Sequence, residues 1–191
     1  MAATEGRDPQ AELARLYPPL APALHAWACL RLQPDERPRL LPEDLTQEVW
    51  LRAFQIFDTF DPSVTSFRAW LFSVAKNVLL EARRRSRRAG AEHAAHGSST
   101  RLASLDQVPL EVTSVTRRVA KDDELRRFVE KLGELDDIER QTVLHCGLEE
   151  LSLEQAAARL GESYAATAKR WRRLRDRLRT WGAPLGLVSG E

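Results

Sequence analysis

The sequence predicts an all-α protein made of two small helical domains joined by a flexible linker. Apolar residues recur at helical spacing through most of the chain, and no segment shows the alternation of a half-buried strand. The composition changes after residue 89, because residues 90–119 open with small and polar residues and contain no aromatic residue. We therefore expect a first domain over residues 10–89, a linker over 90–120, a second domain over 121–181 and a loose tail over 182–191.

The charge and the cysteine content of the sequence argue against a metal-binding protein and against a strong overall electrostatic field. The net charge of +1 gives the whole molecule no strong field, so any effect on a partner comes from local clusters of charge. Cys29 and Cys146 lie far apart, and neither they nor His93 and His96 have the spacing of a zinc site. We expect no metal, no cofactor and two small buried cysteines in a reducing cytosol.

The N-terminal residues carry no secretory signal, since no basic segment precedes an apolar run. The uncharged run "LYPPLAPALHAWACL" is too short to span a bilayer, and Pro18, Pro19 and Pro22 are expected to break it. We therefore expect a cytoplasmic protein without membrane insertion.

The first domain should contain three helices. The first is predicted from Pro22 to about Leu32, because proline is tolerated in a first helical turn. The second is predicted from Pro42 to about Phe57, with acidic residues in its first turn. Its apolar stripe consists of Leu45, Val49, Ala53 and Ile56.

The third helix joins aromatic residues to a dense block of arginines, five of them within residues 83–88. Ser66 is its predicted N-cap, and its buried face should consist of Phe67, Leu71, Val74, Val78 and Ala82. Trp70 and Phe72 lie off this stripe, and the pattern leaves their positions open. Aromatic side chains beside cations suit single-stranded DNA, whose unstacked bases can stack on them.

The second domain contains the pattern of a helix-turn-helix. Ser152 and Gln155 should form a capping box, Gly161 should provide a left-handed turn, and Ser163 should cap the last helix. The predicted core face of that helix consists of Tyr164, Ala168, Trp171, Leu174 and Leu178.

The last helix is unusually basic on its remaining surface. Residues 169–179 contain seven basic residues and one acid, Asp176, whereas a merely solvated helix usually mixes the two signs. A helix with one buried face and one basic face is typical of a recognition helix that contacts DNA.

Three segments resemble bacterial sigma factors of the sigma-70 family, extracytoplasmic-function group: "PEDLTQEVWLRAF", "FDPSVTSFRAWLFSVAKNVLLEARRR" and "LDDIERQTVLHCGLEELSLEQAAARLG". The resemblance covers roughly residues 10–180. It implies a sigma-2 domain and a sigma-4 domain that direct core RNA polymerase, through its β′ and β subunits, to promoter DNA. It also implies assistance in −10 melting, no bond chemistry, and an anti-sigma factor as a further partner.

The resemblance also implies three sets of site residues. The set expected to bind core polymerase is Asp44, Gln47, Glu48 and Leu51. The set expected to bind the −10 element is Asp61, Pro62, Ser63, Val64, Thr65, Ser66, Phe67, Arg68, Trp70, Lys76, Asn77, Arg83, Arg84 and Arg85. The set expected to bind the −35 element is Ser163, Tyr164, Ala165, Ala166, Thr167, Lys169, Arg170, Arg173 and Arg177.

Two features leave alternatives open. The last helix reads "LGESYAATAKRWRRLR" where many family members read close to "LGxSxGTVKSRLxRAR", so the register of the base-contacting side chains is open. A free-standing helix-turn-helix regulator is the alternative function, although its motif accounts only for the C-terminal half. No P-loop, HExxH or GxSxG motif is present, which argues against an enzyme.

Overall fold

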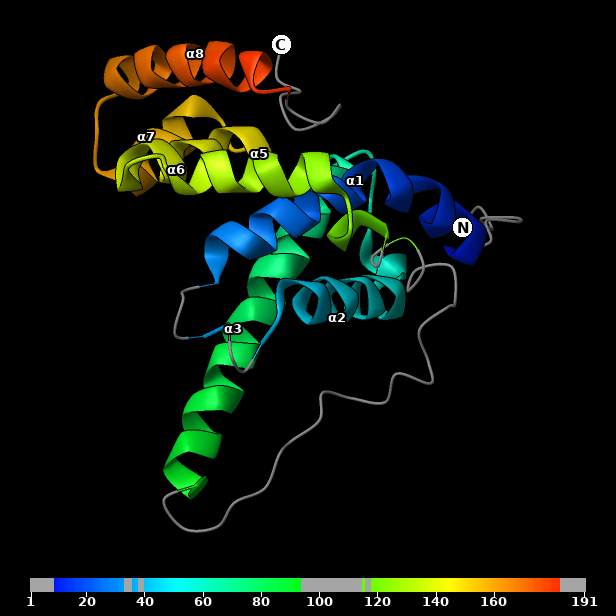
Figure 1. The fold of residues 1–191 in the computed structure, drawn as a ribbon. Coiled ribbons are helices and arrows are strands. Elements are labelled where there is room, and N and C mark those ends of the chain that lie inside the picture. Colours follow the sequence, from blue (N-terminus) through cyan, green and yellow to red (C-terminus); the bar gives the residue numbers. More distant parts are fainter. Residues whose placement is uncertain (1–8, 33–35, 38–39, 94–114, 116–117, 183–191) are drawn as a thin grey trace.

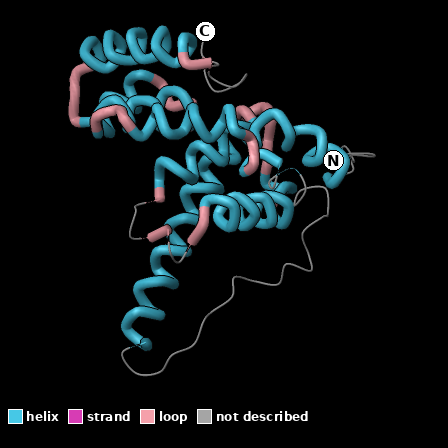
Figure 2. The backbone as a smooth tube through the Cα atoms, viewed as in Figure 1, coloured by secondary structure: helices cyan, strands magenta, loops and turns pink. Residues whose placement is uncertain are grey.

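The computed structural model describes residues 9–32, 36–37, 40–93, 115 and 118–182, and every regular element within these ranges is helical (Figure 2). The elements are α1 (Pro9–Arg31), α2 (Pro42–Gln55), η1 (Phe57–Thr59), α3 (Phe67–His93), α5 (Asp123–Gly133), α6 (Asp137–Thr142), η3 (Val143–Leu148), α7 (Leu153–Leu160) and α8 (Tyr164–Thr180). The predicted all-α class is confirmed. None of the helices in the described ranges has the length and apolarity needed to cross a bilayer.

Helices α5–α7 lie across α1, with α8 beyond them, while α2 and α3 lie on the other side of α1 (Figure 1). Helix α1 contacts α2 and α3, with which it makes up the first half of the protein, and also α5 and η3 of the second half, which consists of α5, α6, η3, α7 and α8. Most of the buried apolar residues of both halves belong to one contiguous cluster. The two predicted helical units therefore contact each other through buried apolar residues in this structure.

Helix α1 differs most from the sequence-based expectation. It begins at Pro9 rather than at Pro22 and runs through Pro18, Pro19 and Pro22, so the prediction that these prolines break the segment is wrong. Its apolar residues explain the difference, because Tyr17 is buried and its ring packs edge-on against Trp50 with 4.0 Å between centroids. Burial on the neighbouring helix outweighs the helix-breaking tendency of proline.

Helix α2 and helix α3 follow the predicted patterns closely. Leu45, Val49 and Ala53 are buried in α2 as predicted, while Ile56 is half-buried and follows its last residue. Ser66 caps α3, since its hydroxyl oxygen accepts a hydrogen bond from the backbone N–H of Ala69 at 3.1 Å.

On α3 the predicted buried face is partly confirmed. Leu71, Val74 and Val78 are buried, whereas Phe67 and Ala82 are half-buried. Phe72, whose position the sequence left open, is completely buried. The helix continues to His93, which takes it into residues 90–93 of the predicted linker, and its C-terminal half extends away from the other helices (Figure 1). Most of that linker, and His96, lie outside the described residues.

The helix-turn-helix has the predicted caps. Ser152 and Gln155 form a capping box, Gly161 has φ of 68°, and Ser163 accepts a hydrogen bond from the backbone N–H of Ala166 at 3.3 Å. Trp171, Leu174 and Leu178 of α8 are buried as predicted.

The prediction that Tyr164 is a core residue is wrong. Its side chain is 52% exposed, and Thr167 is buried instead. Tyr164 begins α8, so it lies on the apolar face but at an end of the helix that its neighbours leave uncovered.

Candidate nucleic-acid interface

Four aromatic rings cluster where η1 meets the start of α3. The ring centroids of Phe60 and Phe67 are 5.4 Å apart, those of Phe60 and Trp70 are 5.5 Å apart, and Phe67 stacks on Trp70 at 5.7 Å. Phe57 underlies the cluster and is buried, whereas Phe60, Phe67 and Trp70 are half-buried. Partly exposed rings of this kind can stack on an unpaired base.

The loop of residues 61–66 adjoins this cluster and is shaped by its own polar groups. The Asp61 carboxylate accepts hydrogen bonds from the Ser63 hydroxyl at 2.6 Å and from the Ser63 N–H at 2.8 Å. These bonds lower the pKa of Asp61 below its ordinary value, the hydroxyl bond contributing most. Val64 is 79% exposed, so an apolar side chain protrudes from an ordered polar turn.

The arginines near the end of α3 divide into paired and unpaired side chains. Arg83 donates hydrogen bonds to Glu36 at 2.6 and 3.0 Å and to the carbonyl oxygen of Arg31 at 2.9 Å. Arg85 lies 3.6 Å from Glu48. Arg84, Arg87 and Arg88 are exposed and form no ion pair with any described residue, so they are available to bind phosphate.

Arg68 lies at the start of α3, where this helix meets η3. Its guanidinium is buried, donates to the carbonyl oxygens of Leu148 at 3.0 Å and Gly147 at 2.9 Å, and lies 3.5 Å from Glu150. Burial lowers the pKa of Arg68, while the charge of Glu150 acts in the opposite direction. Ser66 donates to the same Glu150 carboxylate at 3.0 Å. The turn after η3 therefore covers the first turn of α3.

The side chain of Glu149 is completely buried in the same junction, among donors from both halves. It accepts hydrogen bonds from the Trp27 indole at 3.0 Å and from Arg31 at 2.6 Å. The remaining polar neighbours of its carboxylate are His145 at 3.1 Å, Lys76 at 3.5 Å and Arg159 at 3.6 Å.

The donors around the Glu149 carboxylate keep it negatively charged although it is buried. Burial alone would raise the pKa of Glu149, but the hydrogen bonds of His145, Trp27 and Arg31 and the charge of Arg31 together lower it far below its ordinary value. Burial lowers the pKa of Lys76, and the charge of Glu149 opposes that change. Glu149 is therefore an anion enclosed by donors of α1, α3, η3 and α7.

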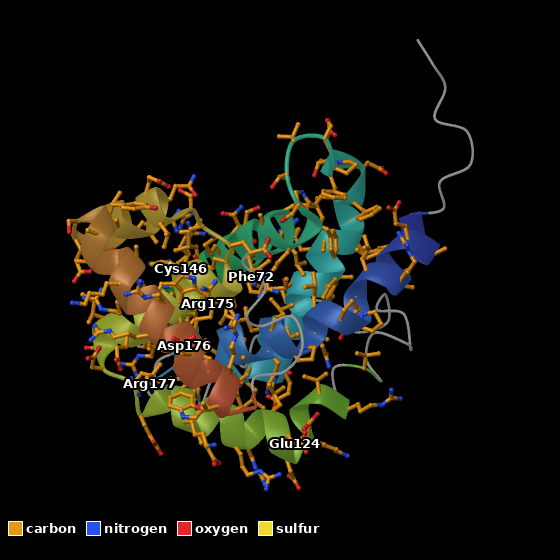
Figure 3. All side chains as sticks on the ribbon, turned by 90° about the horizontal axis from the view of Figure 1, so that it is seen from above. Phe72, Glu124, Cys146, Arg175, Asp176 and Arg177 are labelled. Atoms are coloured by element: carbon orange, nitrogen blue, oxygen red, sulfur yellow. The ribbon has the colours of Figure 1, made fainter. Side chains whose placement is uncertain are left out.

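The exposed surface of α8 is mostly basic. Lys169 and Arg173 are exposed and form no ion pair with any described residue. Arg170 instead forms a two-pronged ion pair with Glu162, and Arg177 donates to Glu139 at 2.8 Å and lies over the ring of Trp181. Figure 3 shows Arg175, Asp176 and Arg177 along α8, at a distance from Glu124 on α5.

The comparisons with known proteins identify the family of this chain. The family model described as "Sigma-70 region 2" matches residues 16–89. The ECF RNA polymerase sigma factor SigK of Mycolicibacterium vanbaalenii is 30% identical over 146 residues, which are 76% of this chain and 69% of that protein. The chain belongs to the ECF sigma factors of the sigma-70 family.

Two further relatives were found for this ECF sigma factor. SigK of Mycobacterium sp. strain KMS is 30% identical over 130 residues, which are 68% of this chain and 64% of the relative's length. The sigma factor RpoE of Bartonella quintana, solved in a co-crystal with the anti-sigma factor NepR, is 25% identical with a TM-score of 0.44. That match covers 90% of this chain and 94% of RpoE.

The residues of this sigma factor that are expected to bind core polymerase share one face of α2. Asp44, Gln47, Glu48 and Leu51 follow one another at helical spacing and are all half-buried. Glu48 is the member of this set that is paired with Arg85.

The sigma factor's expected DNA contacts are not all accessible. Asp61, Pro62, Ser63, Val64, Asn77 and Arg84 are exposed, and so are Ser163, Tyr164, Ala165 and Ala166 on the second half. Arg68 and Lys76 are instead engaged by residues 147–150, and Thr167 is fully buried in the helix-turn-helix. Arg68 and Thr167 are therefore buried in this arrangement, whereas Lys76 keeps 28% of its side chain exposed.

The residues that hold the two halves together were not found from the sequence. Trp27 and Glu149 are 122 positions apart, and Arg68 and Leu148 are 80 apart. An acidic pair after an apolar run ordinarily faces solvent, so "LHCGLEE" gave no sign that Glu149 is buried. Among the described residues, no group of acidic, histidine or cysteine side chains could hold a metal ion.

Proposed function

We propose that this ECF sigma factor binds core RNA polymerase, directs it to promoters and assists melting of the −10 element. The observation that carries the proposal is the cluster of partly buried aromatic rings beside the exposed loop 61–66, within the segment that matches sigma-70 region 2. Rings in this setting suit bases that have left the duplex stack, and a protein that binds only duplex DNA has little use for them.

The proposal assigns the binding of core polymerase, of the −10 element and of the −35 element to three different surfaces. The face of α2 formed by Asp44, Gln47, Glu48 and Leu51 binds core polymerase. Loop 61–66 and α3 hold the opened −10 strand and the duplex next to it. Helix α8 reads the −35 element in the major groove, with Lys169 and Arg173 as its unpaired cations. Two modest DNA-binding surfaces at a spacing set by the polymerase then provide the specificity, without any cofactor or bond chemistry.

The proposal includes regulation by an anti-sigma factor that covers the polymerase-binding face. It also treats residues 10–89 and 121–181 as the two functional units. A free-standing helix-turn-helix regulator accounts only for the second unit, and the match to sigma-70 region 2 lies in the first.

Run-off transcription with purified core polymerase on a genomic DNA library tests the proposal. Transcripts should start downstream of one shared promoter motif, and only when this protein is present. The test variant makes the α2 face basic through Asp44→Lys, Gln47→Lys and Glu48→Lys. This variant should remain folded by circular dichroism and lose both core binding and transcription. If the variant binds core polymerase as well as the wild type does, the α2 face is not the polymerase-binding site.

A further inference from the structure

The pocket around Glu149 is built for an anion, and most of its donors belong to the half of the protein that matches sigma-70 region 2. Trp27, Arg31 and Lys76 come from α1 and α3, whereas Glu149 comes from the turn after η3. Arginine, lysine and indole N–H groups bind phosphate oxygens as readily as carboxylate oxygens. One acidic side chain of the second half thus occupies an anion site of the first half.

This anion site has more donors than the carboxylate uses. The Nε atom of Arg31 is buried and has no hydrogen-bond partner among the described residues. A buried donor without a partner costs free energy, and a carboxylate offers only two oxygens. A phosphate group offers more acceptor oxygens than a carboxylate in a similar volume. A phosphate could therefore also accept a hydrogen bond from Arg31 Nε, which Glu149 leaves without a partner.

The neighbouring contacts cover the −10 surface at the same time. Arg68 and Ser66 donate hydrogen bonds to residues 147–150, so these two side chains at the start of α3 are engaged by protein acceptors. Glu150 has φ of 52°, a conformation that is uncommon for any residue other than glycine. The turn thus combines a sparsely populated backbone conformation at Glu150 with acceptors that contact α3.

We propose that this closed arrangement is an intramolecular block on DNA binding, in which Glu149 occupies a site that a DNA phosphate takes when the two halves separate. The inference rests on the proposed −10 function of α3. His145 and Arg159 belong to the same half as Glu149, so they remain with its carboxylate after separation. Arg31 and Lys76 lose their partner and become available, and DNA that binds only the open form shifts the population towards it.

The test compares Glu149→Gln with Glu130→Gln, a substitution of the same charge at an exposed residue of α5 that forms no ion pair with any described residue. The probe is a fluorescent single-stranded DNA of random sequence, about 20 nucleotides long. Its anisotropy is measured while the protein is added, without polymerase. Glu149→Gln should bind it about tenfold more tightly than the wild type, because a larger fraction of the protein is open. It should also have a larger radius of gyration by small-angle X-ray scattering, and Glu130→Gln should match the wild type in both measurements.

A second substitution identifies the site that the DNA takes. Adding Arg31→Gln to Glu149→Gln should remove most of the gain in affinity while leaving the radius of gyration enlarged, because the protein stays open but lacks a phosphate ligand. An unchanged gain would overturn the role of Arg31 as a phosphate ligand.

Hydrogen exchange on the wild-type protein provides a test that does not depend on a variant folding. Amides of residues 143–151 should exchange faster when the oligonucleotide is bound, and unchanged or slower exchange would overturn the block. The block is also wrong if Glu149→Gln and Glu130→Gln bind the oligonucleotide equally. Run-off transcription by the wild type tests the sigma-factor function separately from the intramolecular block. Transcription can occur even if Glu149 does not block DNA binding, and it can be absent even if Glu149 does.

Discussion

The guanidinium of Arg68 donates to the carbonyl oxygens of Leu148 and Gly147, which lie 80 and 79 positions further along the sequence. Leu148 is the last residue of the π-helical segment η3, and the final carbonyl groups of a helix have no partner within it. A cation at this end also interacts favourably with the helix dipole. A side chain of the first half thus caps a helix of the second half.

Replacing Arg68 by alanine should therefore destabilise the protein by about 3 kcal/mol, because two buried carbonyl groups lose a charged donor. Urea denaturation followed by circular dichroism measures the change. Arg84→Ala is the matched control on the same helix, since Arg84 is exposed, and it should stay within about 0.5 kcal/mol of the wild type. Equal losses in the two variants would show that the capping contacts contribute nothing.

The stability of the protein should depend on pH through Glu149. Its folded pKa lies below the ordinary value of 4.5, so its contribution is complete above that pH and falls as the pH decreases. The difference in unfolding free energy between the wild type and Glu149→Gln should shrink by about 2 kcal/mol between pH 7 and about pH 3. Urea titrations of both proteins across this range measure it, and a constant difference would contradict the buried anion.

Two glycines should respond to alanine in opposite directions. Gly161 has φ of 68°, and an added Cβ meets no atom within 4 Å, so only backbone strain opposes the substitution. Gly161→Ala should destabilise the protein by about 1 kcal/mol. Gly133, the last residue of α5, has the same open surroundings without a positive φ, and Gly133→Ala should stabilise by about 0.5 kcal/mol. Thermal denaturation distinguishes the signs, and a shared sign would refute the left-handed turn.

Two neighbouring arginines of α8 should contribute differently to promoter binding. Arg173 is exposed and unpaired within the described part of the chain, so Arg173→Ala should weaken holoenzyme binding to duplex promoter DNA. It should also reduce the slope of log affinity against log salt by about 1. Filter binding at several salt concentrations measures both quantities.

Arg170 is the comparison for that experiment. Its side chain is 16% exposed and engages Glu162, and the hydrogen bond from Arg170 lowers the pKa of Glu162. Arg170→Ala should therefore leave the salt slope of DNA binding nearly unchanged and lower the melting temperature of the free protein. If Arg170→Ala reduces the slope of log affinity against log salt by a full unit, Arg170 contacts a DNA phosphate instead.

The features that the sequence predicted are those set by residues a few positions apart. The caps at Ser66, Ser152 and Ser163 and the turn at Gly161 were all predicted, and each depends on groups within one helical turn. The apolar stripes of α2 and α3 were also largely predicted, because a periodic pattern identifies the face that a helix buries.

The tertiary structure alone decided which distant groups meet. Helix α1 continues through its prolines because Tyr17 packs on Trp50, and Phe72 is buried although it lies off the periodic stripe. Glu149 remains charged inside the protein because Trp27 and Arg31, more than a hundred positions away, enclose its carboxylate. A local pattern cannot predict such contacts, because the free energy of burying a charge depends on which donors surround it after the helices have packed.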